Sequence, residues 1–476
     1  MSQVELTGLE LPEIKTEIPG PKSVQSVDRL ARGECPAITA RRARRKAETG
    51  VGQDPIVWAR ARGANVEDVD GNLYVDLTSA FAVAGIGHTH PKVVEAAQKQ
   101  LGRVVHAMGD VYPSDAKIEF LDRLVDVMPE GLSQCILGLS GASAIEAALK
   151  TAVVHTGKPG VLSFFGGYHG LGYGALSVTA YRSNFREPFL SQLSGHVRHV
   201  PYPDQYRPPF GMSLDSSPED ISRSCITYIE QILDGPASGG ESIGAIVIEP
   251  IQGRGGEVEP PKGFLSELRR VCDERGIVLI FDEIYTGFAR TGDMFACEHE
   301  GVLPDIMCVG KALGGGVALS AAVGRPEVMA SWGTSSGEAV HTSTFLGNPL
   351  SCAMASAVLD VLQQEQWVEQ VRERGDRLKA RLEGLAEEFP SLIGCVRGRG
   401  YMLGLDLLAD VNTRKPHPAA AIELMDRCRR QGYLVLPSGV HGNILALSPP
   451  FMITDEQLQG FFDVLYKEVK RLYSKI

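Results

Sequence analysis

Lys311 is the side chain with the clearest chemical potential in this sequence. It follows Val309 and Gly310 and precedes Ala312, and three consecutive glycines occupy positions 314–316. A lysine among apolar residues and glycines has a lowered pKa, and its neutral amine can form a Schiff base with an aldehyde. A phosphate-binding P-loop has its glycines before the lysine and Ser or Thr after it. The order found here therefore argues against a P-loop.

A second candidate is Asp282, which directly follows the apolar stretch 277–281. A carboxylate at the end of a buried strand is costly unless it has a partner. It could hold a cationic ring nitrogen, because each charge would keep the other ionised. A helix cap or a structural ion pair is the alternative interpretation.

Two glycine-containing turns add a possible phosphate site and an aromatic ring. Residues 140–143 (Ser-Gly-Ala-Ser) lie between a predicted strand and a predicted helix, so Gly141 and Ala142 could offer backbone N–H groups to a phosphate. An ordinary strand-to-helix turn fits equally well. In 166–170 (Gly-Gly-Tyr-His-Gly), the ring of Tyr168 could lie against a planar cofactor beside His169. Taken alone, a core tyrosine and a satisfied histidine explain that turn better.

Together, these four segments match the needs of one cofactor. A phosphate cradle, a stacking ring, a carboxylate for a ring nitrogen and an amine for an aldehyde are what pyridoxal 5'-phosphate (PLP) requires. The sequence therefore predicts PLP as the cofactor. The nine cysteines are scattered without a CxxC pair, which favours reduced thiols over a disulfide or zinc framework. We expect no metal.

The elements that must position these residues alternate between strand and helix through the middle of the chain. Strands are expected at 136–139, 161–165, 243–248 and 277–281. This alternation predicts an α/β fold with a mainly parallel sheet, whose strand ends collect ligands at one edge. We expect an N-terminal segment (1–76) and a C-terminal part (346–476) to build one smaller α+β domain beside a large domain (77–345). A hairpin at 65–76 and a helix-capping box at 454–457 belong to that smaller domain.

Composition excludes several other classes of protein. The net charge of -11 and the pI of about 5.6 argue against a nucleic-acid-binding surface. The basic run at 41–46 is interpreted as a solvated helix face. The sequence shows no signal peptide and no apolar run of the roughly 18 residues that would span a bilayer. We expect a cytoplasmic enzyme without a membrane or nucleic-acid partner.

From about Pro19 to its end, the sequence resembles the class III aminotransferases of PLP fold type I, a family that includes the 4-aminobutyrate aminotransferases. The motifs that carry this resemblance are the segments 68–76, 85–91, 281–292, 304–311 and 341–349 (His-Thr-Ser-Thr-Phe-Leu-Gly-Asn-Pro). They are long and specific, and they contain both Asp282 and Lys311.

The resemblance implies a role for each matching residue. Lys311 would hold PLP as a Schiff base and move the proton in catalysis, while Asp282 would pair with the pyridinium nitrogen. Tyr168 would stack on the ring, and Gly141 and Ala142 would bind the phosphate. The remaining implied cofactor contacts are His169, Glu249, Tyr285 and Thr344. Thr344 would reach the phosphate of the neighbouring subunit, so we expect a homodimer, alone or paired into a tetramer.

Three positions concern the substrate and the departures from the family pattern. Arg397 matches an arginine that binds a substrate carboxylate in many relatives, a task that suits a bidentate guanidinium. Arg254 stands where relatives of the 4-aminobutyrate and ornithine type have a glutamate that masks this arginine. Tyr285 stands where many relatives have a glutamine that helps to hold the cofactor's phenolic oxygen. Either the tyrosine hydroxyl substitutes or that contact is lost.

The sequence therefore predicts an aminotransferase. Its donor would be an ω-amino acid or a similar primary amine, and its acceptor a 2-oxo acid such as 2-oxoglutarate or pyruvate. Two alternatives within the same scaffold stay open. Segments 20–22 and 201–207 resemble those of amino-acid racemases and epimerases. Arg254 could instead hold the leaving group of a phospho-lyase.

Overall fold

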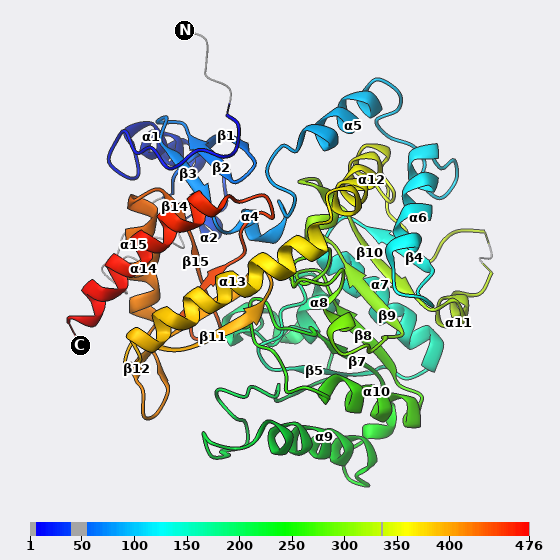
Figure 1. Ribbon diagram of the computed structural model, residues 1–476. Helices are drawn as coiled ribbons and strands as arrows, with labels where there is room; N and C mark the ends of the chain where they lie inside the picture. Colours follow the sequence, from blue (N-terminus) through cyan, green and yellow to red (C-terminus); the bar gives the residue numbers. More distant parts are fainter. Residues whose placement is uncertain (1–5, 40–54, 335–336, 476) are drawn as a thin grey trace. The chain divides into compact units, whose positions relative to one another are not determined.

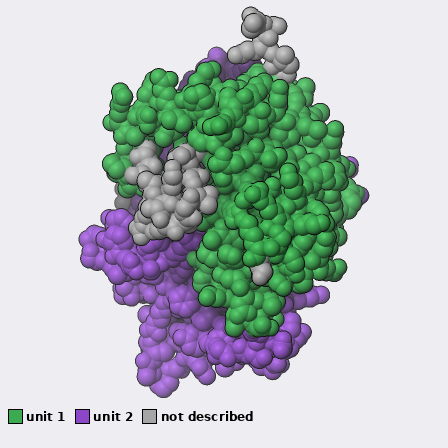
Figure 2. All heavy atoms as spheres, turned by 90° about the vertical axis from the view of Figure 1, so that its left-hand side faces the viewer, with its two compact units in different colours: residues 1–90, 376–397, 401–476 green, residues 91–375, 398–400 purple. Residues whose placement is uncertain are grey.

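The computed structural model describes residues 6–39, 55–334 and 337–475. The basic run at 41–46 lies outside the described residues. The chain divides into two compact units, which Figure 2 shows in different colours. Unit 1 comprises Met1–His90, Asp376–Arg397 and Tyr401–Ile476, and unit 2 comprises Pro91–Gly375 and Gly398–Gly400. The predicted domain boundaries at 76/77 and 345/346 stay a prediction.

A sheet of seven strands, counted among the described residues, forms the centre of unit 2. Its strand order is β4-β10-β9-β8-β7-β5-β6. Strand β10 runs antiparallel to both of its neighbours, and every other neighbouring pair is parallel. The bounds are β4 Gln134–Gly138, β5 Gly160–Phe164, β6 Val197–Val200, β7 Ile243–Ile248, β8 Val278–Asp282, β9 Ile306–Val309 and β10 Ser320–Gly324.

The central strands of this sheet are buried along their whole length. All residues of β7 and β8 are buried, as are all those of β9. Continuous apolar strands of this kind are typical of parallel sheets that helices cover on both faces. Apolar residues of helix α7 (Gly141–Thr156) pack with residues from five of the strands in the main core of the unit. Ser140 caps the start of α7, and Gly157 ends it in a left-handed conformation at φ +68°.

The other helices of unit 2 precede, connect or follow these strands along the chain (Figure 1). They are α5 Pro91–Leu101, α6 Asp115–Val127, α8 Tyr173–Val178, α9 Pro218–Asp234, α10 Phe264–Arg275, α11 Pro326–Met329 and α12 Pro349–Gln364. Short 3-10 helices are η1 Ser183–Phe185, η2 Glu187–Gln192, η3 Gly240–Ser242, η4 Ala296–His299, η5 Lys311–Gly314 and η6 Ala330–Trp332. Helix α13 (Trp367–Glu388) begins in unit 2 and ends in unit 1.

Unit 1 is built from both ends of the chain. One sheet has the order β1-β2-β3-β14, in which the parallel pair Tyr433↔Val75 joins a C-terminal strand to an N-terminal one. The second has the order β11-β12-β16-β15, and β13 pairs with β12. The strands are β1 Trp58–Arg62, β2 Asn65–Asp68, β3 Leu73–Asp76, β11 Ile393–Arg399, β12 Met402–Asp410, β13 Lys415–Pro416, β14 Tyr433–Leu434, β15 Leu436–Ser438 and β16 Ile444–Leu447.

The helices of unit 1 come from both ends of the chain. They are α1 Pro21–Leu30, α2 Pro36–Thr39, α4 Ser79–Ala82, α14 Pro418–Arg430 and α15 Asp455–Tyr473. Thr454 and Gln457 form the predicted capping box at the start of α15. The predicted α/β fold, with a mainly parallel sheet and a smaller α+β part from both chain ends, is confirmed. In the described part of the chain, no helix combines the length and the apolar character that crossing a membrane requires.

Candidate functional site

Four neighbouring parallel strands of unit 2 each end next to a candidate residue. The strands β9, β8, β7 and β5 are consecutive in the sheet, and their carboxyl ends lead to Lys311, Asp282, Glu249 and Tyr168 respectively. Because parallel strands end at the same edge of a sheet, the fold gathers these four residues along one edge. The sheet therefore brings together residues that lie more than a hundred positions apart in the sequence.

Lys311 lies two residues after β9 and begins η5. Its φ is +44°, in the left-handed region that a residue with a side chain seldom adopts. Strain of this kind is concentrated at functional sites. Burial lowers the pKa of Lys311 to about 8, although the negative charges of Asp282 and Glu249 act to raise it. The neutral amine is thus about a tenth of the total at pH 7 and about half at pH 8.

Asp282 and His169 are hydrogen-bonded to each other. The Nδ1 atom of His169 lies 2.8 Å from Oδ2 of Asp282, and the exposed fractions of these residues are 2% and 4%. The other oxygen of Asp282 accepts the backbone N–H of Ile284 at 3.1 Å. Burial opposes protonation of His169, but the hydrogen bond and charge of Asp282 outweigh it, so the pKa of His169 is raised. The pair can therefore keep a buried negative charge on Asp282.

Glu249 connects two loops at the same edge of the sheet. Its Oε2 accepts the backbone N–H of Tyr168 at 3.0 Å, and its Oε1 accepts that of Gly253 at 3.2 Å. The phenol of Tyr202 donates to the carbonyl of Glu249 at 3.3 Å and so supports the same turn. Burial raises the pKa of Glu249 to about 7.

Tyr285 presents the face of its ring to Lys311. The Nζ atom of Lys311 lies 4.3 Å from the centroid of this ring. Gly253 packs on the same ring, because a Cβ atom at Gly253 would lie 3.0 Å from Cγ of Tyr285. The tyrosine at this position therefore adds a cation–π contact to the lysine.

Arg254 lies over three aromatic rings. Its guanidinium carbon is 4.5 Å from the ring centroid of Tyr168, 5.2 Å from that of Tyr181 and 5.4 Å from that of Phe185. The side chain is nevertheless exposed. Sequence reasoning missed Tyr181 and Phe185, since the segment that holds them carries no motif and only the fold brings them to Arg254.

The predicted phosphate turn lies at the start of α7. Gly141 and Ala142 are the first two residues of this helix, where backbone N–H groups lack partners within the helix. The hydroxyl of Ser320 in β10 donates to the carbonyl of Ser140 at 2.6 Å and holds the turn in place. A Cβ atom at Gly170 would lie 2.6 Å from that of Ala142, so the loop carrying Tyr168 approaches this turn closely.

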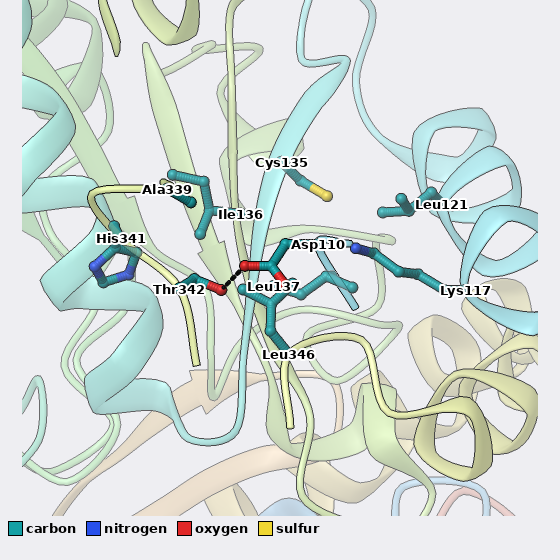
Figure 3. A pocket seen from close by; sticks show the side chains of 10 residues that line it. All are labelled: Asp110, Lys117, Leu121, Cys135, Ile136, Leu137, Ala339, His341, Thr342 and Leu346. Atoms are coloured by element: carbon teal, nitrogen blue, oxygen red, sulfur yellow. Dashed lines mark hydrogen bonds between the residues drawn. The ribbon is translucent and has the colours of Figure 1, made fainter. Parts of the chain in front are cut away.

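Two predicted residues do not belong to the strand ends and loops described above. Arg397 belongs to unit 1, where its Nη2 lies 2.6 Å from Oδ2 of the fully buried Asp406. Thr344 belongs to unit 2 and is exposed. Its neighbours His341, Thr342 and Leu346 line a pocket of about 180 Å³ whose lining contains none of the predicted site residues (Figure 3).

The wall of this pocket is fixed by hydrogen bonds at the start of α6. The hydroxyl of Thr342 donates to Oδ2 of Asp110 at 2.9 Å, as the dashed line in Figure 3 marks. The Nζ atom of Lys117 donates to the carbonyl of Gly109 at 2.6 Å. The segment around Thr344 is thereby held against the loop that precedes α6.

Comparison with known proteins gives a consistent result. The model of the family "Aminotransferase class-III" matches residues 47–469. An alanine/serine racemase of Pyrococcus horikoshii is 32% identical over 98% of this chain and 94% of its own length. A 4-aminobutyrate aminotransferase of Mycobacterium leprae is 34% identical over 95% of this chain and 97% of its own length.

The solved structures agree with the sequence relatives. The crystal structure of an amine transaminase from an uncultivated Pseudomonas species, in its PLP-bound form, superposes with a TM-score of 0.82. It is 31% identical and covers 88% of this chain and 96% of its own. The predicted fold type and the predicted cofactor are thereby confirmed. The chain belongs to the class-III aminotransferase family and is a pyridoxal 5'-phosphate-dependent aminotransferase.

Proposed function

We propose that this enzyme moves an amino group from an ω-amino acid or a related primary amine, such as 4-aminobutyrate, to a 2-oxo acid such as 2-oxoglutarate or pyruvate. The observation that carries the proposal is the convergence of Lys311, Asp282, Glu249 and Tyr168 at the carboxyl ends of four neighbouring strands. The 4-aminobutyrate aminotransferase among the relatives supports this substrate class.

The residues at this edge fit PLP. When bound, PLP supplies an aldehyde that takes up an amine and a ring that withdraws electrons. Asp282, kept charged beside His169, would hold a protonated ring nitrogen. Gly141 and Ala142 would bind the phosphate through backbone N–H groups at the start of α7.

The side walls of the site would come from the two loops that Glu249 joins. The ring of Tyr168 would stack on the cofactor, with its backbone held by Glu249. Tyr285 would lie beside Lys311 and keep the amine in place through its ring face. His169 and Glu249 would then act mainly by positioning Asp282 and Tyr168. These assignments rest on the placement of the residues along the sheet edge.

Lys311 is the residue that would hold the cofactor and move a proton. Burial lowers its pKa to about 8, so near neutral pH it has both a neutral amine that can accept a proton and an ammonium that can return one. The protonated and neutral forms are then close in free energy, which suits a group that alternates between them.

Two arginines are candidates for binding a substrate carboxylate. Arg254 is exposed and lies over the ring of Tyr168. Arg397 forms an ion pair with the buried Asp406 in unit 1. A carboxylate partner already compensates the charge of Arg397, whereas Arg254 lies over the ring of Tyr168, one of the residues at the sheet edge. We therefore assign the carboxylate first to Arg254 and retain Arg397 as the second candidate.

A screen of amine donors tests the proposed function. Enzyme loaded with PLP is mixed with 4-aminobutyrate or another donor, and the absorbance of the cofactor is followed through one turnover. We expect loss of the PLP band and its return when 2-oxoglutarate or pyruvate is added. A Lys311→Ala variant should fail in both steps. The proposal is wrong if no donor changes the spectrum of the wild-type enzyme.

Racemisation is a second candidate, because one relative is named an alanine/serine racemase. Racemisation needs proton transfer on both faces of the reacting carbon. Lys311 could serve one face, and the phenol of Tyr285, whose ring lies 4.3 Å from the lysine Nζ atom, is the candidate for the other. Loss of optical rotation in L-alanine without any 2-oxo acid would instead indicate a racemase.

We also propose a cytoplasmic homodimer in which Thr344 reaches the partner's cofactor. An exposed apolar surface supports this dimer: Val105, Met108, Val111, Tyr112 and Phe345 are each at least half exposed. The ring of Phe345 lies 5.1 Å from that of His106, so this surface adjoins Thr344. Apolar patches of this kind mark interfaces. Met108→Glu should weaken the dimer in sedimentation, and Thr344→Ala should weaken retention of PLP.

A further inference from the structure

The three rings around Arg254 also contact one another. The ring centroids of Tyr168 and Tyr181 are 6.1 Å apart, those of Tyr168 and Phe185 are 6.3 Å apart, and those of Tyr181 and Phe185 are 5.9 Å apart. The first two pairs are edge-to-face, an arrangement that aromatic pairs favour. We call Tyr168, Tyr181 and Phe185 the ring cluster. It holds a cation at 4.5 to 5.4 Å from each of its three centroids.

The backbone that carries Arg254 is tied to the loop that carries Tyr168. Both Tyr168 and Gly253 donate to the carboxylate of Glu249. The side-chain amide of Gln252 donates to the carbonyl of Phe165 at 2.8 Å. A Cβ atom at Gly255 would lie 2.8 Å from the carbonyl oxygen of Gly166, so the two loops approach each other closely there. The backbone on both sides of Arg254 is therefore held against the loop that carries Tyr168.

Arg254 also lies within electrostatic reach of Lys311. Burial is the largest cause of the lowered pKa of Lys311, and the positive charge of Arg254 adds to it. Gly253, the residue before Arg254, packs on the ring of Tyr285 beneath the lysine amine. A molecule that contacts Lys311 therefore lies in the electrostatic field of the Arg254 guanidinium, whose backbone the two tied loops hold.

We propose that Arg254 is a permanent receptor for a substrate carboxylate, and that Tyr181 and Phe185 are specificity-determining residues that hold it in place. This inference rests on the proposed function and narrows it. An arginine that served only one half-reaction would have to leave the site in the other. The ring cluster and the tied loops oppose such a movement, so both the amino donor and the 2-oxo acceptor must carry a carboxylate. Amines without a carboxylate should be poor donors.

Matched donors test this requirement in the PLP-loaded enzyme. n-Butylamine is 4-aminobutyrate with a methyl group in place of the carboxylate, and isopropylamine is related to L-alanine in the same way. In whichever pair reacts, we expect kcat/KM of the wild type for the amino acid to exceed that for the amine by about 100-fold. In Arg254→Gln this preference should fall by about 10- to 100-fold, because a hydrogen bond to a charged group is lost. For the amino acid the change should lie mainly in KM, because the lost contact is to a carboxylate that both the bound substrate and the transition state keep.

A binding measurement shows whether Arg254 binds a carboxylate even if no donor reacts. Glutarate carries carboxylates and no amine, so its affinity for the loaded enzyme can be measured by calorimetry. We expect Arg254→Gln to weaken glutarate binding by about 10-fold or more. Arg223→Gln removes an equal charge from the exposed surface of α9, where Arg223 pairs with Asp220, and should leave the affinity unchanged.

The ring cluster is tested by paired variants at Tyr181. Tyr181→Phe keeps the ring and should bind glutarate like the wild type, whereas Tyr181→Leu should weaken binding about 3- to 10-fold. Phe185→Leu provides a second variant should Tyr181→Leu fail to fold. The inference is overturned if n-butylamine matches 4-aminobutyrate in the wild type, or if Arg254→Gln keeps the affinity for glutarate. If no donor changed the spectrum, the proposed function would be contradicted. The affinity for glutarate would then still show whether Arg254 binds a carboxylate.

Discussion

Asp282 and Glu283 stand next to each other at the end of β8, yet they lie in two different buried regions of unit 2. Asp282 faces the sheet edge, where it meets His169 at 2.8 Å and acts on the pKa of Lys311. Glu283 is fully buried elsewhere and accepts the backbone N–H groups of Ala296 and Cys297 at 3.0 and 2.8 Å. We call these the Asp282 region and the Glu283 region.

The difference between the two regions follows from strand geometry. Successive side chains along a strand point to opposite faces, so neighbouring acids at a strand end enter different surroundings. In the Glu283 region the donors are backbone N–H groups and the hydroxyl of Thr286, and they fix the loop that leads to η4. In the Asp282 region the donor is a histidine whose pKa is raised. A carboxylate paired with a titratable cation suits chemistry, and one surrounded by backbone donors suits structure.

The largest expected effect comes from exchanging each acid for its amide. Asp282→Asn should lower kcat/KM by about 100-fold or more, because it removes the negative charge that would hold a protonated ring nitrogen. Glu283→Gln should change kcat/KM by less than about 3-fold. The carboxyl group of Glu283 bonds to Thr286 and to the backbone at the start of η4, which are not residues of the candidate site. Steady-state kinetics of both variants, on enzyme loaded with PLP, measure this contrast.

Thermal unfolding of the same two variants provides the control. Asp282→Asn should keep a midpoint close to that of the wild type, whereas Glu283→Gln should shift it. Equal losses of activity in both variants, or a larger loss in Glu283→Gln, would remove the distinction between the two regions.

The next effect is the pH dependence of stability in the Glu283 region. Burial raises the pKa of Glu283 from 4.5 to about 7. The folded protein therefore keeps a proton on Glu283 over a range in which the unfolded chain releases it. The contribution of Glu283 to the free energy of unfolding is highest below about pH 4.5 and falls until about pH 7. The fall amounts to about 3 kcal/mol, at roughly 1.4 kcal/mol for each pKa unit.

Glu283→Gln should remove this dependence, because glutamine does not titrate. The unfolding midpoint of the variant, relative to that of the wild type, should therefore rise between pH 4.5 and 7. A constant difference between Glu283→Gln and the wild type across this range would show that Glu283 is ionised throughout.

Much of the fold could be predicted from local sequence signals. The six apolar residues 243–248 were expected as a strand and form β7, because a buried parallel strand needs no polar alternation. The capping box at Thr454 likewise placed the start of α15. The apolar run 433–436 is divided between β14 and β15, which belong to different sheets. Only the tertiary arrangement of unit 1 decides that division.

The site was predictable only as separate parts. Motifs singled out Lys311 and Asp282, and the sequence left open whether Asp282 had a structural partner and whether His169 was a satisfied core residue. The structure answers the first question with the contact between Nδ1 of His169 and Asp282, and it answers the second in the negative, since the buried Nε2 atom of His169 has no hydrogen-bond partner among the described residues. That contact joins residues from β8 and from the loop after β5, so no local pattern could reveal it. The position of Tyr181 and Phe185 around Arg254 is long-range in the same sense.

A smaller effect concerns the rate at which the PLP-free protein takes up its cofactor. The neutral amine of Lys311 is the form that reacts with an aldehyde, and burial lowers its pKa to about 8. The rate of uptake should therefore rise about 10-fold from pH 7 and level off above about pH 9, whereas an ordinary lysine would level off above 10. Stopped-flow absorbance over this range measures the profile. Glu283→Gln should give the same midpoint, and a midpoint near 10.5 in the wild type would contradict the lowered pKa.

The smallest expected effect comes from removing one hydrogen-bond donor in each region: His169, which donates to Asp282, and Thr286, which donates to Glu283. His169→Ala removes the donor to Asp282 and should weaken retention of PLP about 3- to 10-fold, with a smaller loss in His169→Asn, whose amide can still donate from a similar position. Thr286→Val removes the hydroxyl that donates to Glu283 and should lower the unfolding midpoint without changing retention of PLP. Equilibrium dialysis of the loaded enzymes gives the affinities. If His169→Ala kept its cofactor while Thr286→Val lost it, the roles of the two regions would be the reverse of those proposed, because the hydrogen bonds to Glu283 would then support the cofactor.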